Sequence, residues 1–392
     1  MFKTINAHQM RKINRSAILE YIRVNSPTSR TEISQKLDVS LPTVMRIVDE
    51  LISAGLVCLS GETESGKGRK RELLEFNENA YSVLGIDLGG TKMYGAIANI
   101  GGEILHEVNL EHHCTTGEES FKTLVSLIEK LLEKAEGGPV VNGIAVGAPG
   151  ITQSKEGIVE WAPSLDWKNY PLKKKLEDHF DIPCFVDNDV NLATLGEQWF
   201  GVGNGKNHMM IIALGTGVGG GLILDGALYR GFSGASGEIG YLCTDVDDLG
   251  KLYDVFGAFE NRVSGTGIRE NAIQKLKDLG MDHEDVDSLK VFEAAAENQP
   301  WAVEVVEETA DFLAMAIANI NTLLDLELVV FSGGVSNSAH VLLDKIEEQM
   351  TGVIPRLPEI RISSLGRKAT VMGAIVLVVH AVDDYYVVRG LS

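Results

Sequence analysis

Hydrophobic residues near the start of the chain recur at helical spacing and are followed by short apolar runs. Residues 8–25 place isoleucine and leucine side chains at near-helical intervals among basic residues, which predicts an amphipathic helix. Ser29 and Glu32 have the spacing of a capping box and predict a short second helix. Ser40 is placed to cap a third helix, in whose first turn Pro42 is tolerated. A short helix, a tight turn and a capped helix form the helix-turn-helix plan.

A candidate DNA-reading surface follows from this plan, because the second helix of the motif presents its N-terminal residues to base edges. Beyond it, the apolar runs 55–58 and 73–76 predict the two strands of a wing, with a glycine-rich basic tip between them. Such a tip suits a phosphate backbone or a minor groove. The alternative is a three-helix bundle used for dimer contacts, with a solvated charge run beside it. The candidate DNA-binding residues are Ser40, Thr43, Arg46, Arg69, Lys70 and Arg71.

This segment resembles the winged helix-turn-helix at the N-terminus of transcriptional repressors in the ROK family (repressors, open reading frames and sugar kinases). Gly68-Arg69 matches the Gly-Arg pair that is usual in the wing of that family. The resemblance implies that the wing contacts DNA. We therefore expect a DNA-binding domain over residues 1–79.

After the first 80 residues, apolar runs of strand length alternate with amphipathic helices, which is the pattern of an α/β fold. The stretches 83–98 and 211–223 each consist of two apolar runs around a glycine-rich turn, so they predict hairpins of one design. This repetition favours a duplicated α/β fold with a nucleotide held between its halves. A third glycine turn, Gly333-Gly334, follows the apolar run 328–331 and would let an adenosine lie against the backbone.

The turn of the first hairpin carries the chemistry of a magnesium–nucleotide site. Asp87 lies at the mouth of the turn Gly89-Gly90, next to Thr91 and Lys92. A carboxylate suits the metal, while exposed amides, a hydroxyl and an ammonium group suit the phosphates. We therefore expect ATP with Mg2+ as a cofactor, with Asp87 reaching the metal through the nucleotide. An ordinary glycine turn is the alternative interpretation.

The stretch 185–191 ends an apolar strand in closely spaced carboxylate and amide side chains. Such side chains lie at the carboxyl edge of a strand, where α/β sheets bind ligands. A carboxylate there can accept a proton from a sugar hydroxyl, and base catalysis of this kind is worth ~10²–10⁴-fold. Asn188 would fix the neighbouring hydroxyls. The same residues can equally form an Asx-rich turn that caps the following helix.

Residues 80–385 resemble the kinase body of the ROK family, a branch of the hexokinase/actin-like ATPase (ribonuclease H-like) fold, through the three glycine turns and Asp189. The resemblance implies that Asp189 is the catalytic base. It also implies two phosphate loops and a nucleoside contact, formed by Asp87, Gly89, Gly90, Thr91, Lys92, Gly215, Thr216, Gly217, Gly333 and Gly334. By the same resemblance, the sugar-binding residues are Gly150, Asn188, Asp189, Glu238, Tyr241 and Glu260.

The stretch 237–241 departs from the family pattern, in which a zinc-ligating histidine occupies the position of Tyr241. The three-cysteine motif that follows in the family is also missing, and Cys243 stands alone. We therefore predict no structural zinc, and we expect apolar packing by Tyr253, Phe256 and Phe259 to take its place. Because position 241 faces the substrate in relatives, the exchange leaves the identity of the sugar open.

Charge is unevenly distributed along the chain. The formal net charge is −20, yet residues 1–76 hold 12 basic and 9 acidic residues, so the acidic excess lies in the remainder. This asymmetry favours a small nucleic-acid reader joined to an acidic body. Four widely separated cysteines predict neither a disulfide framework nor a cysteine-rich zinc site. With no signal-peptide core and no apolar run of bilayer length, we expect a cytoplasmic protein without membrane contact.

We expect three domains, at residues 1–79, 80–190 and 191–392, with the final helix packing back on the first half of the body. One function that fits is a sugar-responsive DNA-binding regulator of carbohydrate metabolism genes, acting as a repressor. We expect it to bind operator DNA as a homodimer or higher homo-oligomer. An alternative is an ATP-dependent sugar kinase of the glucokinase or N-acetylhexosamine kinase type, with Asp189 as base. A catalytically inert sugar-binding protein is a third interpretation. The complete DNA-reading segment favours a regulator that retains nucleotide binding.

Overall fold

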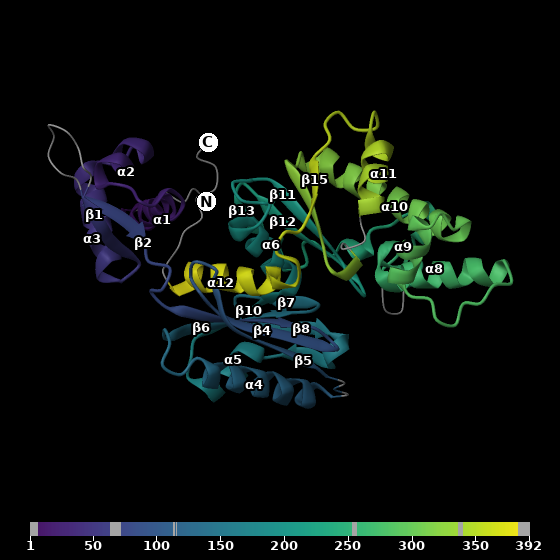
Figure 1. Cartoon of the computed structure of the whole chain (residues 1–392), viewed down its shortest axis with the longest axis horizontal. Coiled ribbons are helices and arrows are strands. Elements are labelled where there is room, and N and C mark those ends of the chain that lie inside the picture. The colour runs from purple at the N-terminus through teal and green to yellow at the C-terminus, as the bar shows by residue number, and fades with distance from the viewer. Residues whose placement is uncertain are drawn as a thin grey trace.

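The computed structural model describes residues 7–62, 72–112, 114, 116–252, 257–335 and 340–382. Three of the candidate DNA-binding residues, Arg69, Lys70 and Arg71, lie outside the described residues. The same holds for Tyr253 and Phe256, which we expected to replace a zinc site. Figure 1 shows the first three helices and two strands at one end of the molecule, beside a larger α/β body.

The N-terminal unit consists of three helices and a two-stranded antiparallel wing. The Ser29 hydroxyl accepts the Glu32 N–H at 3.3 Å and caps the second helix, as the sequence predicts. Ser40 precedes the third helix, but its hydroxyl bonds the Thr43 hydroxyl at 2.8 Å and makes no cap hydrogen bond. The prediction of a capping side chain at Ser40 is therefore wrong. The elements are α1 (Ala7–Asn25), α2 (Arg30–Leu37), α3 (Leu41–Ser53), β1 (Val57–Glu62) and β2 (Glu72–Phe76).

The first half of the body is a five-stranded sheet in the order β10-β6-β3-β4-β5. Its central hairpin pairs β3 antiparallel to β4, and the other edge of β3 pairs parallel to β6. The turn at Gly89-Gly90 joins β3 to β4, where the sequence predicts it. The strands are β3 (Ser82–Leu88), β4 (Lys92–Asn99), β5 (Ile104–Glu111), β6 (Val141–Ala148) and β10 (Cys184–Asn188).

The second half repeats this plan in the order β13-β12-β11-β14-β15. Here β11 pairs antiparallel to β12 and parallel to β14, so it occupies the place that β3 has in the first sheet. The shared strand order and directions confirm the predicted duplicated α/β fold. The strands are β11 (Met209–Leu214), β12 (Val218–Leu224), β13 (Ala227–Tyr229), β14 (Leu328–Ser332) and β15 (Glu359–Ile362); a small third sheet contains β7 (Ile151–Gln153), β8 (Ile158–Ala162) and β9 (Trp167–Tyr170).

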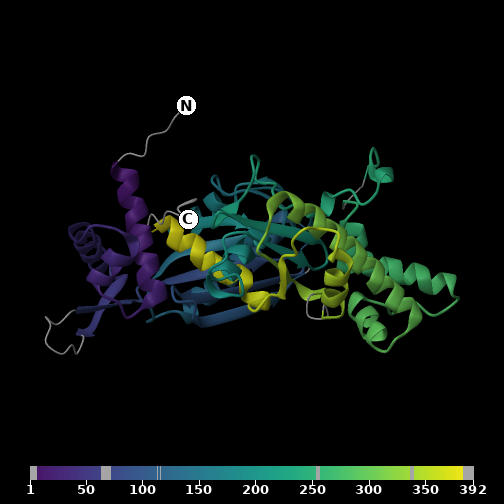
Figure 2. The ribbon, with the colours of Figure 1, turned by 90° about the horizontal axis from the view of Figure 1, so that it is seen from above.

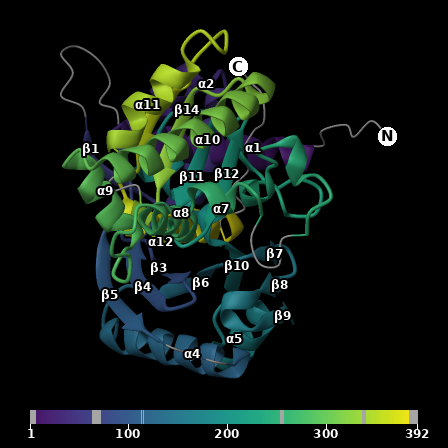
Figure 3. The same cartoon turned by 90° about the vertical axis from the view of Figure 1, so that its right-hand side faces the viewer.

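Two helices, α6 and α12, lie between the two large sheets, as Figure 1 shows; α12 can also be followed in Figure 3. Small residues make this close approach possible: a Cβ added at Gly85 of β3 would lie 2.9 Å from the Ala374 Cβ of α12. A Cβ at Gly221 of β12 would lie 1.9 Å from the Thr194 hydroxyl of α6. The remaining helices cover the outer faces. The helices of the body are α4 (Gly117–Lys134), α5 (Leu172–Phe180), α6 (Asp189–Phe200), α7 (Glu260–Val263), α8 (Gly265–Asp278), α9 (Ser288–Ala296), α10 (Pro300–Leu324), α11 (His340–Met350) and α12 (Ala369–Val382).

The N-terminal unit is packed against the body rather than suspended from it. One cluster of buried apolar side chains runs from Ile18 and Ile22 of α1 to Leu195 of α6 and Val379 of α12. Figure 2 shows α1 between the rest of the N-terminal unit and the body. Within the described ranges, none of the helices combines the length and hydrophobicity that a bilayer span requires.

Candidate functional site

Carboxylates from both halves of the body converge between the two sheets. Asp87 lies near the end of β3 and Asp189 opens α6, whereas Glu238 and Glu260 belong to loops and helices that follow β12. The negative charges of Asp87 and Glu238 both raise the pKa of Asp189, and Glu238 also raises the pKa of Glu260. Because charges influence one another's pKa only over short distances, these effects link the four groups to one region of the body.

Burial is the main cause of the unusual ionisation of these carboxylates. It raises the pKa of Asp87 to about 6, although a hydrogen bond from the Thr370 hydroxyl acts in the opposite direction. Burial and the neighbouring negative charges raise the pKa of Asp189 to about 7, against a hydrogen bond from the Val190 N–H. A carboxylate with a pKa near 7 can accept a proton efficiently at neutral pH.

The Glu260 carboxylate lies between two stretches of bare backbone. A Cβ at Gly217 or at Gly240 would lie 2.6 Å from one of its oxygens. Burial raises its pKa to about 7. Tyr241, at the position where the family has histidine, is 61% exposed, and burial, Glu238 and Glu260 together raise its pKa. The phenol therefore faces the same pair of glutamates and remains open to solvent.

The sequence leaves two roles open for Asn188, a helix cap and a contact to a ligand, and the geometry of its side chain allows both. Its Oδ1 accepts the N–H groups of Val190 and Asn191 at 2.9 and 3.1 Å, so it caps α6. Its Nδ2 donates to the carbonyl oxygen of Gly150 at 3.0 Å. An amide nitrogen has two donors, so one N–H is left to bind a ligand. Gly150 itself has a φ of +79°, and a Cβ there would lie 2.0 Å from the Trp161 carbonyl oxygen.

A buried ion pair that the sequence analysis missed supports these residues. The Asp187 side chain is 1% exposed, and its Oδ2 accepts the Nε and Nη2 of Arg230, the former at 2.9 Å. Its Oδ1 accepts the N–H of Asn188 and the side-chain amide of Asn191. Arg230 precedes the loop that carries Glu238, so Asp187 fastens that loop to the start of α6. A buried Asp signals a cationic partner, but the sequence alone does not say which one.

The first glycine turn is closed on itself and held from one side. The Gly89 N–H donates to the Lys92 carbonyl at 2.9 Å, and Nε2 of His112 lies 3.0 Å from the Gly89 carbonyl oxygen. A Cβ at Gly90 would lie 2.8 Å from the Ser164 Cβ. Thr91 and Lys92 are exposed, and the Lys92 ammonium lies 3.5 Å from the Glu111 carboxylate. Lys92 thus points to a neighbouring strand residue rather than to the four carboxylates.

The second and third glycine turns adjoin each other. The Gly215 N–H donates to the Gly217 carbonyl at 2.9 Å, and the Thr266 hydroxyl of α8 donates to the Thr216 carbonyl at 3.0 Å. Gly333 has a φ of +91°, and a Cβ there would lie 2.3 Å from the Leu214 carbonyl oxygen at the end of β11. At Gly334 an added Cβ meets nothing within 4 Å. The backbone of this turn is therefore open to close approach by a ligand.

The glycine turns offer open backbone and polar side chains to a ligand. The open backbone at Gly334 and the exposed Thr216 offer contacts of the kind that a nucleoside and phosphates use. Asp87 is the carboxylate at the mouth of the first turn. Among the described residues, no group of three His, Cys, Asp or Glu side chains is arranged to hold a metal ion by itself. The predicted absence of zinc stays a prediction.

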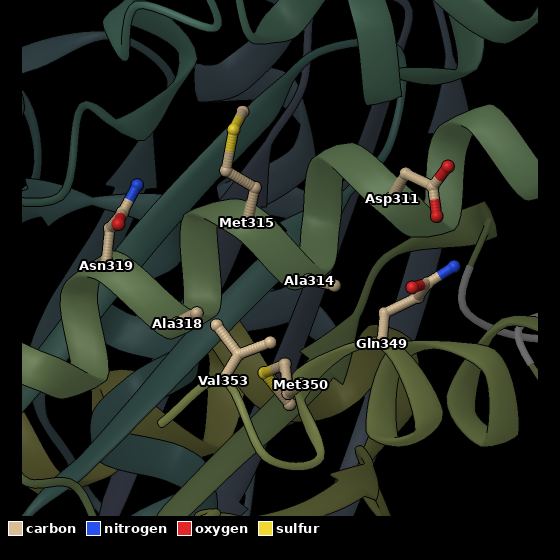
Figure 4. Close-up of a pocket in the computed structure, with 8 residues that line it drawn as sticks. All are labelled: Asp311, Ala314, Met315, Ala318, Asn319, Gln349, Met350 and Val353. Atoms are coloured by element: carbon tan, nitrogen blue, oxygen red, sulfur yellow. The ribbon is translucent and has the colours of Figure 1, made fainter. Parts of the chain in front are cut away.

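A separate groove of about 320 Å³ lies between α10 and α11, away from these carboxylates (Figure 4). It contains none of the residues that the sequence analysis assigned to a site. Met315 and Val353 give it an exposed apolar rim. Its lining consists of Asp311, Ala314, Met315, Ala318, Asn319, Gln349, Met350 and Val353.

The start of α3 forms the exposed face of the helix-turn-helix. Ser40 and Arg46 are exposed, and Thr43, whose hydroxyl bonds that of Ser40, is half-buried. Two apolar side chains, Leu41 and Met45, are 40% and 48% exposed on the same helix. Exposed apolar and cationic side chains at the N-terminus of such a helix suit contacts with thymine methyl groups, guanine edges and phosphates.

Comparison with known proteins links both parts of the chain to described families. A family model named "ROK family" matches residues 83–381, which is more than half of the chain. A second model, "Winged helix-turn-helix DNA-binding", matches residues 11–57.

Individual relatives separate into two kinds. A "Xylose repressor" from Caldicellulosiruptor bescii is 30% identical over 94% of this chain and 96% of its own length. A crystal structure of a ROK family transcriptional regulator, described as a homologue of the E. coli MLC protein, has a TM-score of 0.82 and 25% identity over 94% of this chain and 96% of its own. A ROK glucokinase from Streptomyces griseus, solved with glucose and AMPPNP, has a TM-score of 0.66 and 29% identity, covering 76% of this chain and 98% of its own.

Proposed function

The chain belongs to the ROK family, and from this premise we propose that it is a sugar-responsive transcriptional repressor that binds operator DNA through its winged helix-turn-helix. The observation that carries the proposal is the match to a repressor along nearly the full length of both chains. The glucokinase match covers a smaller share of this chain although it spans almost the whole of its own. The N-terminal DNA-reading segment supports a repressor, because a repressor must bind DNA and a sugar kinase has no need of such a segment.

The proposed effector is a neutral sugar bound among the four carboxylates. Asp189, Glu238 and Glu260 would accept hydrogen bonds from sugar hydroxyls, and Asn188 and the Gly150 backbone would border them. Buried acceptors of this kind suit a ligand that is rich in hydroxyl groups and carries no negative charge. D-xylose is the first probe, because the repressor from C. bescii carries that name.

Operator release by a sugar is the direct test. Fluorescence anisotropy with the DNA upstream of the gene should show sequence-dependent binding, weakened by D-xylose or by another member of a panel of pentoses, hexoses and N-acetylhexosamines. Glu238→Gln should weaken the sugar response without weakening operator binding. Absence of sequence preference at every salt concentration would contradict the proposal.

Phosphoryl transfer to the sugar is a second candidate function, favoured by Asp189 and its pKa of about 7 beside the glycine turns. In this proposal, Asp87 would hold Mg2+ through ATP, and Gly89, Gly90, Thr91, Lys92, Gly215, Thr216, Gly217, Gly333 and Gly334 would border the phosphates and nucleoside. ATP would supply the transferable phosphoryl group. Asp189 would accept the proton of the attacking hydroxyl.

Coupled measurement of ADP release across the sugar panel tests this second function. Asp189→Asn should lower turnover by about 10²-fold or more, because the proton acceptor is lost. Unchanged turnover in Asp189→Asn would exclude the assigned base. A protein that releases its operator on sugar binding but shows no turnover would be a repressor only.

Further parts of the proposal concern assembly, DNA contacts and location. We propose a homodimer or higher homo-oligomer, since helix-turn-helix proteins commonly bind two half-sites related by two-fold symmetry. Cytoplasmic location follows from an operator as the partner. The proposed domains are 1–79, 80–190 and 191–392, and the proposed DNA contacts are those of Ser40, Thr43, Arg46, Arg69, Lys70 and Arg71.

A further inference from the structure

Two helices begin at the carboxylate site and reach the N-terminal unit. Asp189 is the first residue of α6, and Thr370, in the first turn of α12, bonds Asp87. Toward their other ends, Trp199 of α6 and His380 of α12 lie with ring centroids 5.2 Å apart. In Figures 1 and 2, α12 extends from the middle of the body toward α1. Both helices therefore contact the site and the base of the DNA-reading unit.

The two helices are packed backbone against backbone where they cross. A Cβ at Gly373 of α12 would lie 1.7 Å from the Leu192 carbonyl oxygen of α6. A Cβ at Gly196 of α6 would lie 2.3 Å from the Ala369 carbonyl oxygen of α12. No side chain fits at these two points, so there is no flexible layer to absorb a displacement. A shift of one helix must therefore be followed by the other.

Arg23 of α1 connects the N-terminal unit to the far end of these helices. Its guanidinium carbon lies 4.5 Å from the centroid of the Trp199 ring, and its Nε and Nη2 donate to the Glu20 carboxylate at 2.8 and 2.7 Å. The Arg23 side chain is 16% exposed and Trp199 is 9% exposed. On another side of Trp199, His380 packs edge-on, and burial lowers its pKa to about 4, so its ring is neutral. A partly desolvated cation over an indole face is a specific and orientation-dependent contact.

The segment that joins the N-terminal unit to the body is also fastened at both ends. The Asn77 side-chain amide donates to the Gly55 carbonyl of the N-terminal unit at 2.7 Å. On the body side, the Ile100 N–H donates to the Glu78 carbonyl at 3.1 Å, and the Asn99 amide donates to the Asn79 side chain at 3.0 Å. The unit is thus attached through the connecting segment and, at α1, through the Arg23–Trp199 contact and the buried apolar cluster around it. A displacement of Trp199, with the connecting segment fixed, would rotate α1 and the helices packed on it.

We propose that the Arg23–Trp199 contact is the coupling point through which occupancy of the carboxylate site changes the orientation of the DNA-reading unit. A ligand that alters Asp87 or Asp189 acts on the first turn of α12 or α6, and the paired helices transmit the shift to Trp199. The inference rests on the proposed sugar-responsive repressor. Coupling between two ligands typically changes affinity by about 5- to 150-fold, and a contact that carries it should account for most of that factor.

Arg23→Met tests the coupling, because methionine keeps the apolar length of the side chain and removes the cation. The matched control is Lys175→Met on α5, since the Lys175 ammonium lies 4.5 Å from the ring centroid of Phe121 on α4, outside the site and the N-terminal unit. In full-length protein, operator Kd is measured with and without saturating D-xylose. The ratio of the operator Kd with D-xylose to the Kd without it should be preserved in Lys175→Met. In Arg23→Met this ratio should fall to within about threefold of unity. An unchanged ratio in Arg23→Met overturns the inference.

A second measurement needs neither DNA nor sugar. Thr370→Val removes the hydroxyl that bonds Asp87 and so perturbs the site end of α12. Hydrogen exchange of the α1 amides should change severalfold on this substitution in the wild-type background and not in Arg23→Met. An equal effect in both backgrounds, or none in either, overturns the inference. Failure of the proposed function looks different, since the wild-type protein itself would then show no operator binding or no release.

Discussion

Ionisation of individual carboxylates makes sugar binding depend on pH. Asp87 has a pKa of about 6, while Asp189 and Glu260 have pKa values of about 7, so each gains its charge as pH rises through this range. Sugar hydroxyls donate best to the ionised form, and binding therefore releases protons. The affinity for D-xylose should rise between pH 5.5 and 8, by up to about tenfold per pH unit for each proton released. Calorimetric titration across this range measures the slope.

The unliganded protein should respond to pH in the opposite sense. Because the folded state holds these carboxyl protons more tightly than the unfolded state, it binds more protons between about pH 4 and 7, and stability falls as pH rises through that window. Glu260→Gln should flatten both pH profiles. Asp285→Asn, which alters an exposed carboxylate on the surface, should leave both unchanged. An affinity that falls with rising pH would show that the carboxylates do not accept sugar hydroxyls in their charged form.

Single residues also show where sequence reasoning stops. Family resemblance assigned Asp87 to the nucleotide and Asp189, Glu238 and Glu260 to the sugar. In the structure, Asp87 and Glu238 raise the pKa of Asp189, and Glu238 raises that of Glu260. Their roles remain predictions. Thr370 could not have been assigned, because a threonine at the start of an apolar helix has no local feature that indicates a partner at the other end of the chain.

At the scale of elements, the close crossing of α6 and α12 depends on glycine. Gly373→Ala should destabilise the protein by about 1–3 kcal/mol, because the added methyl group would lie 1.7 Å from the Leu192 carbonyl oxygen and must push the helices apart. This cost should exceed the gain of up to about 1 kcal/mol that alanine brings to a helix interior. Urea unfolding followed by circular dichroism measures the free energy change.

Gly334→Ala is the matched control, since an alanine Cβ there meets nothing within 4 Å. Its stability should stay within about 0.5 kcal/mol of wild type, as is usual for open surface positions. If Gly373→Ala proved as stable as this control, the two helices would have to be able to separate without loss. The rigid pairing of α6 and α12 would then be wrong.

Local signals explain which elements the sequence could predict. The glycine turns between apolar runs at 83–98 and 211–223 mark both hairpins, and the 3.6-residue periodicity marks α1 and α4. By contrast, α12 is buried along nearly its whole length, so it has no polar face and its hydrophobic pattern does not indicate which sheet it contacts. Ser40 has the residue type of a cap, but the nearby Thr43 hydroxyl competes for its oxygen.

For the whole molecule, the separation of charge predicts how DNA binding depends on salt. Residues 66–71 are rich in Lys and Arg and belong to a segment, 1–76, with a small positive charge, while the rest of the chain is strongly acidic. Because each neutralised phosphate releases counterions, Arg69→Ala should weaken operator binding and reduce the slope of log K against log salt by about 0.9. Arg361→Ala, on β15 of the body, is the control and should leave the slope unchanged. Equal slopes in wild type and Arg69→Ala would exclude Arg69 as a phosphate contact.

Continuity of the core across the molecule makes a prediction about cooperativity. Because the buried cluster of α1 is continuous with that of α6 and α12, the DNA-reading unit should not unfold before the body. Calorimetry of the full chain should then show one main transition, and sugar at 100 times its Kd should stabilise that whole transition by about 2.7 kcal/mol. An early transition that sugar does not move would mean that the N-terminal unit is energetically independent. In that case α6 and α12 would join the two sites in space without coupling their free energies, since a ligand can bias only the structure whose stability it shares.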